Sequence, residues 1–204
     1  MMKFFGTKSV AFLALGLVFG FAHAQDDGES SHVPIENPAD LSHAEANEIY
    51  DRLRKRMADA FELAGVEEIE DYQSWKRYNS APYISATHGQ RFVNSFGNSK
   101  ATNYGKLPKG ETYPEGTVFA KDSITVIDDE RTYPGAMFMM EKLAEGAHPE
   151  TADWRYVMVL PDGTTFGDTT GSEPKLVKYC HACHVAKASD DYVFFVPEEY
   201  QLEE

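Results

Sequence analysis

The sequence has few cysteines, few basic residues and only one long apolar run. Two cysteines among 204 residues exclude a small scaffold built on several disulfides. The 19 basic residues are outnumbered by 33 acidic ones, so the net charge is −14. A surface of this sign repels nucleic acid and anionic lipid, and we expect neither as a partner.

The one apolar run lies at the N-terminus and is typical of a secretory signal peptide. Lys3 and Lys8 come first, residues 10–21 are uncharged, and Ala22-His23-Ala24 places two small residues before an acidic stretch. The alternative is a membrane anchor, but the run is shorter than the roughly 18–20 apolar residues that a span needs. We therefore expect a signal peptide over residues 1–24, export to the periplasm, and no membrane span after cleavage. Loss of Lys3 and Lys8 takes the charge from −14 to −16.

The mature chain is expected to begin with a lead-in and a helix. Residues 25–40 are polar and include Pro34 and Pro38, which favours a flexible lead-in. Ser42 and Glu45 form a capping-box pattern, and apolar residues recur at helical spacing after it. Gly65 is expected to end the helix, which gives an N-terminal helix region over residues 41–71.

From Tyr72 onward the pattern changes to strands. Residues 90–96 alternate, residues 117–127 are rich in β-branched side chains, and residues 137–142 and 154–160 give two further strands. Pro161-Asp162-Gly163 predicts a turn after the last of these. A helix is expected over residues 174–187. The predicted fold class is α+β, predominantly an antiparallel β-sheet with an N-terminal helix and a C-terminal helix that carries the cysteines.

The two cysteines form the segment Cys180-His181-Ala182-Cys183-His184. This is the pattern of covalent haem attachment, in which each thiol adds to a haem vinyl group. The spacing lets both sulfurs reach neighbouring vinyls from one helical turn, and the next residue then directs its imidazole at the iron. The sequence therefore predicts one haem c per chain, with Cys180 and Cys183 as attachment points and His184 as the iron ligand.

Two other interpretations of this segment compete. A redox disulfide of thioredoxin type would need a βαβ context, whereas this pair follows a run of strands. A zinc site would need Cys180, His181, Cys183 and His184 to converge on one metal, and adjacent residues diverge on a helix. His181 is the variable position inside the haem motif, and we do not expect it to be a ligand.

With this motif in place, the sequence resembles the cytochrome P-460 family, which includes cytochrome c′-β. The resemblance runs from about Tyr72 to Tyr200, and the family-like haem domain is expected over residues 72–204. Its marks are Thr87-His88-Gly89-Gln90-Arg91-Phe92-Val93-Asn94, Gly116-Thr117-Val118-Phe119-Ala120-Lys121-Asp122, Met140-Glu141-Lys142, Asp153-Trp154-Arg155-Tyr156, Cys180 to His184, and Asp191-Tyr192-Val193-Phe194.

The resemblance implies a β-rich haem domain, often a homodimer, whose five-coordinate iron binds small nitrogen species. In cytochrome P-460 a lysine after a Gly-Thr-Val stretch is bonded to the haem edge, and the enzyme oxidises hydroxylamine. Lys121 falls on that position. In the c′-β relatives the cross-link is absent, and an apolar pocket binds nitric oxide or carbon monoxide.

Four residues are candidates for catalysis. Lys121 lies mid-strand on the same face as Phe119 and Ser123, where a lysine is usually solvent-facing; burial beside a haem would favour its neutral, nucleophilic form. His88, Arg91 and Glu141 are candidates for handling protons on the open side of the iron, and a structural hydrogen-bonding role is the alternative for His88 and Arg91.

Three functions are compatible with these features. The first is an oxidoreductase of hydroxylamine or nitric oxide that passes electrons to a soluble acceptor such as a small, basic cytochrome. The second is a non-catalytic haemoprotein that binds nitric oxide. The third is a simple electron carrier in which a methionine fills the second axial position. The candidates for that methionine are Met137, Met139 and Met140, and core packing is the alternative role for all three.

Overall fold

A computed structural model describes residues 34–128 and 130–202. The predicted signal peptide and the first part of the lead-in lie outside these residues. The rest of the lead-in follows the sheet, because the Ile35 and Ala39 amides donate to the carbonyls of Gly89 and Val126, each at 3.0 Å. Among the described helices, none combines the length and apolar character needed to cross a membrane.

The described chain folds as one antiparallel sheet between helices. The helices and strands are α1 (His43–Glu62), β1 (Lys76–Arg77), β2 (Tyr83–Ser85), β3 (Arg91–Gly97), β4 (Val118–Val126), β5 (Thr132–Pro134), β6 (Met137–Lys142), β7 (Trp154–Val159), β8 (Thr165–Asp168) and α2 (Lys178–His184). Short 3-10 turns occupy Glu67–Ile69, Tyr72–Ser74, Ala86–His88, Pro149–Thr151, Pro174–Val177, Val185–Asp190 and Glu198–Tyr200.

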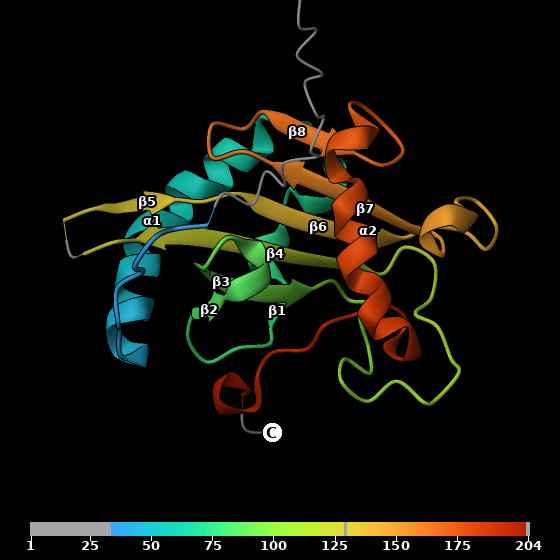
Figure 1. Cartoon of the computed structure of the whole chain (residues 1–204), viewed down its shortest axis with the longest axis horizontal. Coiled ribbons are helices and arrows are strands. Elements are labelled where there is room, and N and C mark those ends of the chain that lie inside the picture. The colour runs from blue at the N-terminus through green and yellow to red at the C-terminus, as the bar shows by residue number, and fades with distance from the viewer. Residues whose placement is uncertain (1–33, 129, 203–204) are drawn as a thin grey trace, which may run out of the picture.

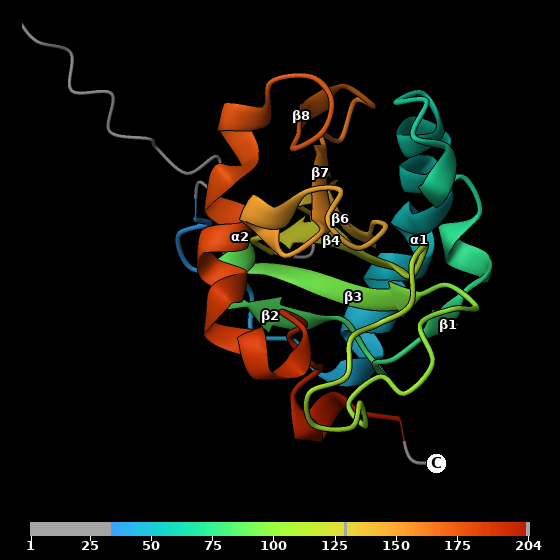
Figure 2. The same ribbon diagram turned by 90° about the vertical axis from the view of Figure 1, so that its right-hand side faces the viewer.

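The sheet has eight strands in the order β1-β3-β4-β6-β7-β8, with β2 paired to β3 and β5 paired to β4. Figure 1 shows α2 crossing one face of this sheet, and Figure 2, turned by 90°, shows α1 on the opposite face. The predicted fold class is therefore confirmed: an antiparallel sheet with one helix near each end of the chain.

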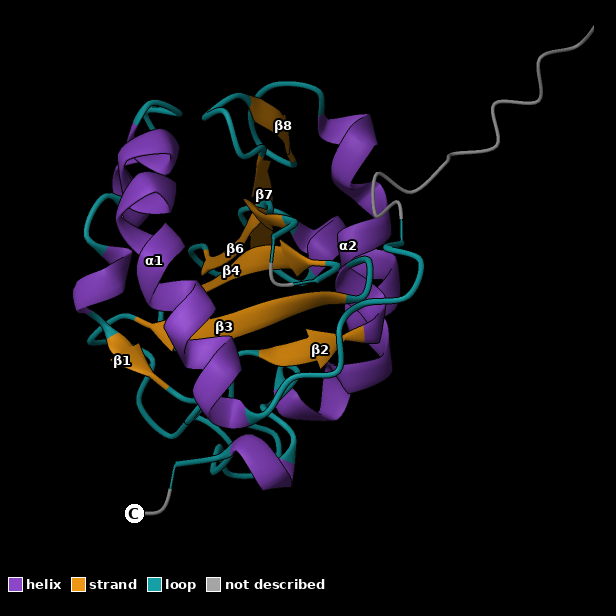
Figure 3. Cartoon of the chain, turned by 90° about the vertical axis from the view of Figure 1, so that its left-hand side faces the viewer, coloured by secondary structure: helices purple, strands orange, loops and turns teal. Residues whose placement is uncertain are grey.

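Helix α1 forms as its sequence predicts. The Ser42 hydroxyl accepts from the Glu45 amide, and the Glu45 carboxylate accepts from the Ser42 amide at 2.8 Å, which closes the capping box. Gly65 follows the helix end with a positive φ of 64°. The helix lies across the sheet in Figure 3 and buries Ala46, Ile49, Tyr50, Met57 and Phe61 against it.

Strand β4 lies inside the sheet and separates two different environments. Its even-numbered residues face α1, and Val118, Ala120, Ile124 and Val126 belong to the core packed under that helix. Buried Asp122 faces the same way and accepts hydrogen bonds from Tyr50 Oη at 2.7 Å, Tyr72 Oη at 3.0 Å and Asn94 Nδ2 at 3.1 Å. The odd-numbered residues face α2, because side chains alternate along a strand.

The C-terminal helix is shorter than predicted. Of the expected residues 174–187, only Lys178–His184 are α-helical, and 3-10 turns flank them on both sides. Pro174 begins the first turn, where a missing amide hydrogen costs nothing.

Candidate haem site

A cavity lies between the α2-facing side of the sheet and the C-terminal segment. No Asp or Glu among the described residues lines it. Its lining is strongly aromatic and includes Phe96, Tyr104, Phe119, Phe138, Tyr156 and Phe194.

Helix α2 directs Cys180, Cys183 and His184 to this cavity. Residues three and four apart lie on one helix face, and all three line the cavity. Both thiols are free. Burial raises the pKa of Cys180 to about 12, so its sulfur stays protonated at neutral pH. The two thiols and one imidazole therefore lie on the same wall, as the sequence predicts.

The imidazole of His184 has a fixed orientation. Its Nδ1 donates to the carbonyl of Tyr192 at 2.6 Å, and the rings of Tyr156 and Phe194 pack against it edge-on at 5.3 and 5.2 Å. Burial, together with the charge of Lys121, lowers the pKa of His184 to about 4. The ring is therefore neutral at physiological pH, with the Nε2 lone pair available to a metal.

His181 is held differently. Its ring packs at 5.2 Å from Tyr192, its Nδ1 is 3.4 Å from Tyr156 Oη, and it is not part of the cavity wall. In residues 34–128 and 130–202, no group of three or more His, Cys, Asp or Glu side chains is arranged to hold a metal ion. This arrangement gives no support to the zinc interpretation.

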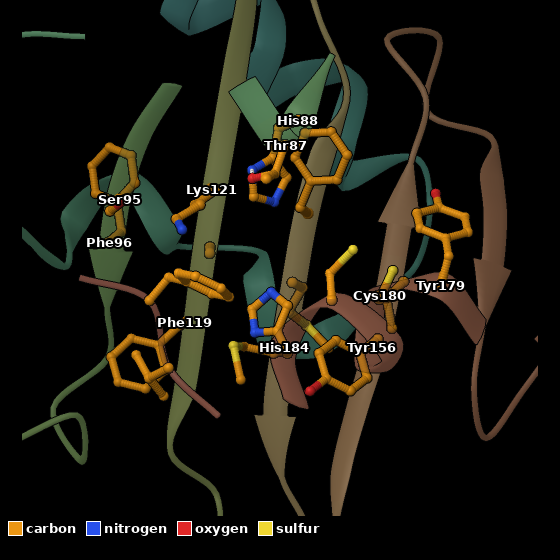
Figure 4. Close-up of a pocket in the computed structure, with 18 of the residues that line it drawn as sticks. Thr87, His88, Ser95, Phe96, Phe119, Lys121, Tyr156, Tyr179, Cys180 and His184 are labelled. Carbon is orange, nitrogen blue, oxygen red and sulfur yellow. Dashed lines mark hydrogen bonds between the residues drawn. The ribbon is translucent and has the colours of Figure 1, made fainter. Parts of the chain in front are cut away.

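Lys121 projects from β4 into the cavity, as Figure 4 shows, with His88 and His184 around the same space. On the neighbouring strands its partners are Ser95 and Phe138. Burial lowers the pKa of Lys121 to about 8, so a large fraction of its amine is neutral near physiological pH. Its Nζ makes no hydrogen bond or ion pair within the described chain, and its positive charge adds to the lowering of the His184 pKa.

His88 lines the cavity and Arg91 lies behind it. The 3-10 turn Ala86–His88 places the His88 ring 4.7 Å from the ring of Phe138, and its Nδ1 is 2.8 Å from Ser85 Oγ. Arg91 is absent from the cavity lining, and its guanidinium donates to the His88 carbonyl at 3.4 Å. His88 can therefore meet a bound ligand directly, whereas Arg91 supports the turn.

Glu141 lies on the other face of the sheet. Its carboxylate accepts from Arg155 Nη1 at 3.0 Å, and Arg155 also binds Glu68 and Asp168 at 2.9 and 2.8 Å. The structure thus separates Glu141 from Lys121 and His88 and places it in a half-buried ion-pair cluster.

The three methionines lie in the protein core. Met137 and Met139 belong to the cluster under α1, whereas Met140 packs on the cavity side of the sheet. Met140 and Met139 line the cavity and Met137 does not.

Several residues of the site are missed by sequence reasoning. The Tyr192 carbonyl orients His184, Tyr156 packs against it, and Ser95 lies opposite Lys121. Strand alternation is the only sequence signal for Ser95, which pairs with Lys121 and faces the cavity with it. The Tyr192 contact depends on a backbone turn that carries no residue-type signal.

The residues present fit a haem group. A flat apolar cofactor with one metal needs an aromatic cavity, one neutral imidazole with its second nitrogen anchored, and, for covalent attachment, two thiols on one helical turn. All of these lie on the walls described above, and together they define a haem-binding cytochrome.

A family model described as Cytochrome P460 matches residues 69–195, most of the folded chain. The chain therefore belongs to the cytochrome P460 family. A search of curated proteins gave no match.

Proposed function

We propose that the protein is an exported, single-haem c-type cytochrome that oxidises hydroxylamine or nitric oxide and passes the electrons to a soluble acceptor. The observation that supports this most directly is the placement of Lys121, a buried amine without a hydrogen-bond partner in the described chain, on the wall facing His184. When bound, haem supplies an iron that binds the nitrogen of the substrate and accepts its electrons.

The chain's own residues divide this work. Cys180 and Cys183 would hold the haem covalently, each by adding its S–H across a vinyl group, which needs no oxidant. His184 would supply Nε2 to the iron, while its Nδ1–H donates to the Tyr192 carbonyl. His88 offers the only imidazole besides His184 on the described cavity wall and is placed to accept a substrate proton.

Lys121 is proposed to bond to the porphyrin edge. Forming the N–C bond removes one hydrogen from Nζ and one from carbon, so two protons and two electrons leave, and a two-electron oxidant such as a peroxide is required. The neutral amine that this needs is favoured by burial. The bond would tether the cofactor to β4 as well as to α2.

Covalent attachment is tested on denaturing gels stained for haem. A stained band at the mature mass is expected, and it should disappear when Cys180→Ala and Cys183→Ala are combined. Haem that extracts into acidified organic solvent would contradict attachment.

The Lys121 bond is tested by tryptic mass spectrometry. A peptide containing Lys121 should be joined to the Cys180–Cys183 haem peptide, because trypsin does not cleave after a modified lysine. Lys121→Met should keep the haem but give an ordinary c-type spectrum and little hydroxylamine oxidation. Lys178→Met, an exposed position at the start of α2, is the matched control and should behave as wild type.

A second function is favoured by the absence of carboxylates from the described cavity wall. With few proton-transfer groups and a largely aromatic lining, the cavity also suits reversible binding of nitric oxide, as in cytochrome c′-β. Recovery of unmodified Lys121, with normal cleavage after it, would place this function first.

A further inference from the structure

The orientation of His184 depends on one backbone carbonyl, eight residues further along the chain. The hydrogen bond from His184 Nδ1 to the Tyr192 oxygen is 2.6 Å long. Such a bond fixes both the tautomer and the direction of a metal-binding imidazole, and it raises the basicity of the other ring nitrogen. Any residue that fixes the Tyr192 carbonyl therefore acts on the iron ligand.

The backbone at this carbonyl has an unfavourable conformation. Asp191 has φ 47° and ψ 45°, and Tyr192 has φ 65°. Two consecutive non-glycine residues in the left-handed region are rare, because Cβ approaches the following carbonyl oxygen. Such a turn persists only where its surroundings hold it.

The side chain of Asp191 supplies that hold. Its Oδ1 accepts from Lys142 Nζ at 2.8 Å and from Trp154 Nε1 at 3.3 Å, and its Oδ2 accepts from the Tyr113 amide at 2.8 Å. Lys142 is the last residue of β6 and Trp154 the first of β7, and the two are cross-strand partners. Asp191 is thus bound to two strands and to the loop before β4.

The pair is buried outside the cofactor cavity. The side chains of Asp191 and Lys142 are only 2% and 9% exposed, and neither lines the cavity. Lys142 also donates to the Ala152 carbonyl at 3.1 Å and lies 4.9 Å from the centre of the Trp154 ring. A buried ion pair gains little stability over an apolar pair of the same volume, so stability alone does not account for this one.

We infer that Asp191, held by Lys142, is a positioning residue that fixes the direction of the His184 imidazole through the Tyr192 carbonyl. The inference rests on the proposed role of His184 as the iron ligand. Asp191 and the groups that bind it, Lys142, Trp154 and the Tyr113 amide, form a clamp on His184. When this clamp is removed, the 191–192 turn relaxes, the hydrogen bond from His184 Nδ1 weakens, and the imidazole becomes less basic. A less basic ligand stabilises ferric iron less, so the reduction potential rises.

The test measures the iron–histidine stretching band of the ferrous holoprotein by resonance Raman spectroscopy, together with the reduction potential. In Asp191→Asn the band should move to lower frequency and the potential should rise. Asp190→Asn is the matched control, because it removes the same charge at the neighbouring residue. The Asp190 carboxylate lies 3.9 Å from Lys187 Nζ and takes no part in the clamp. Its band should stay at the wild-type frequency.

The variant Lys142→Met distinguishes a loss of His184 positioning from the electrostatic effect of removing a charge. Loss of a positive charge alone lowers the potential and leaves the band in place, whereas loss of positioning lowers the band frequency. If the single variants do not fold, Lys142→Met combined with Asp191→Leu removes both charges together and should show the same lowered band.

A wild-type band frequency in the folded Asp191 and Lys142 variants would overturn the inference and leave the proposed function intact. If wild-type protein itself showed no iron–histidine band, His184 ligation would fail, and the inference with it.

Discussion

His88 and Glu141 were equivalent candidates in the sequence, and the structure separates them by one sheet. His88 lies on the cavity wall beside Phe138, whereas Glu141 is bound to Arg155 on the opposite face. Strand alternation decides which face of the sheet a side chain occupies. On β6, Phe138 and Met140 point to the cavity, and Glu141, next to Met140, points to the opposite face.

We therefore predict opposite effects of two substitutions. His88→Gln should lower kcat/KM for hydroxylamine oxidation by about 10²-fold or more, the usual contribution of a general acid or base. Glu141→Gln should leave kcat/KM unchanged and change the free energy of unfolding by only about 1 kcal/mol, because Gln keeps an acceptor oxygen and Arg155 keeps the carboxylates of Glu68 and Asp168. Steady-state kinetics and urea denaturation of both variants provide the measurement. A large kinetic effect of Glu141→Gln alone would contradict the placement.

At the scale of elements, α1 is stabilised by a local motif at its start. Ser42→Ala removes the acceptor for the Glu45 amide and should lower the free energy of unfolding by about 0.5–2 kcal/mol. Ser42→Asp keeps an acceptor and should cost much less. Urea denaturation followed by circular dichroism compares the two, and equal losses would show that the cap contributes nothing.

Asp122 couples α1 to the sheet in a way that depends on pH. Burial raises the pKa of this carboxyl from 3.8 to about 6, against the hydrogen bonds from Tyr50, Asn94 and Tyr72 that lower it. The native state therefore binds more protons than the unfolded chain between about pH 4 and 6. The contribution of Asp122 to stability is largest below that window and is lost as the pH rises through it.

Asp122→Asn should remove this part of the pH dependence. The free energy of unfolding, measured by urea denaturation from pH 4 to pH 7, should fall less steeply with rising pH in this variant than in wild type. Asp40→Asn, a change at an exposed position before α1, is the control and should keep the wild-type slope. Parallel slopes for all three proteins would contradict the raised pKa.

The elements that sequence reasoning found are those specified locally. The capping box of α1, the strands at 118–126, 137–142 and 154–159, and the Cys180–His184 motif each depend on residues close in the chain. The short strands β1, β2, β5 and β8 have only two to four residues, too few to show alternation, and were not predicted. The clamp on His184 joins residues 113, 142, 154 and 191, and no local pattern relates them.

On the scale of the whole molecule, the fold extends beyond the family match. Residues 69–195 match the family model, and α1 precedes them. This helix nevertheless covers the back of the sheet and binds Asp122 through Tyr50. The role of α1, which the sequence left open, is to close the core on the side away from the cavity.

The net charge of −14 leads to a prediction about electron transfer. Attraction to a basic cytochrome speeds encounter at low salt and is screened as the Debye length shortens. The second-order rate of reduction of a basic small cytochrome should therefore fall as ionic strength rises from about 10 mM to about 500 mM, because the Debye length shortens from roughly 30 Å to a few ångströms. Stopped-flow kinetics measures it, with an acidic cytochrome as the control, for which the rate should rise. A flat profile with the basic acceptor would contradict electrostatic steering.

Lys121 and Asp122 are adjacent in β4 and face opposite sides of the sheet, one into the cavity and one into the core under α1. The pairing of Ser95 with Lys121 and of Asn94 with Asp122 sets this arrangement. A slip of one residue between β3 and β4 would exchange an amine for a carboxylate beside the cofactor and would bury an ammonium among tyrosines. The sheet register therefore decides which of these two ionisable side chains faces the cavity, and the hydrogen bonds of Asp122 to Tyr50 and Asn94 favour the native register over the slipped one.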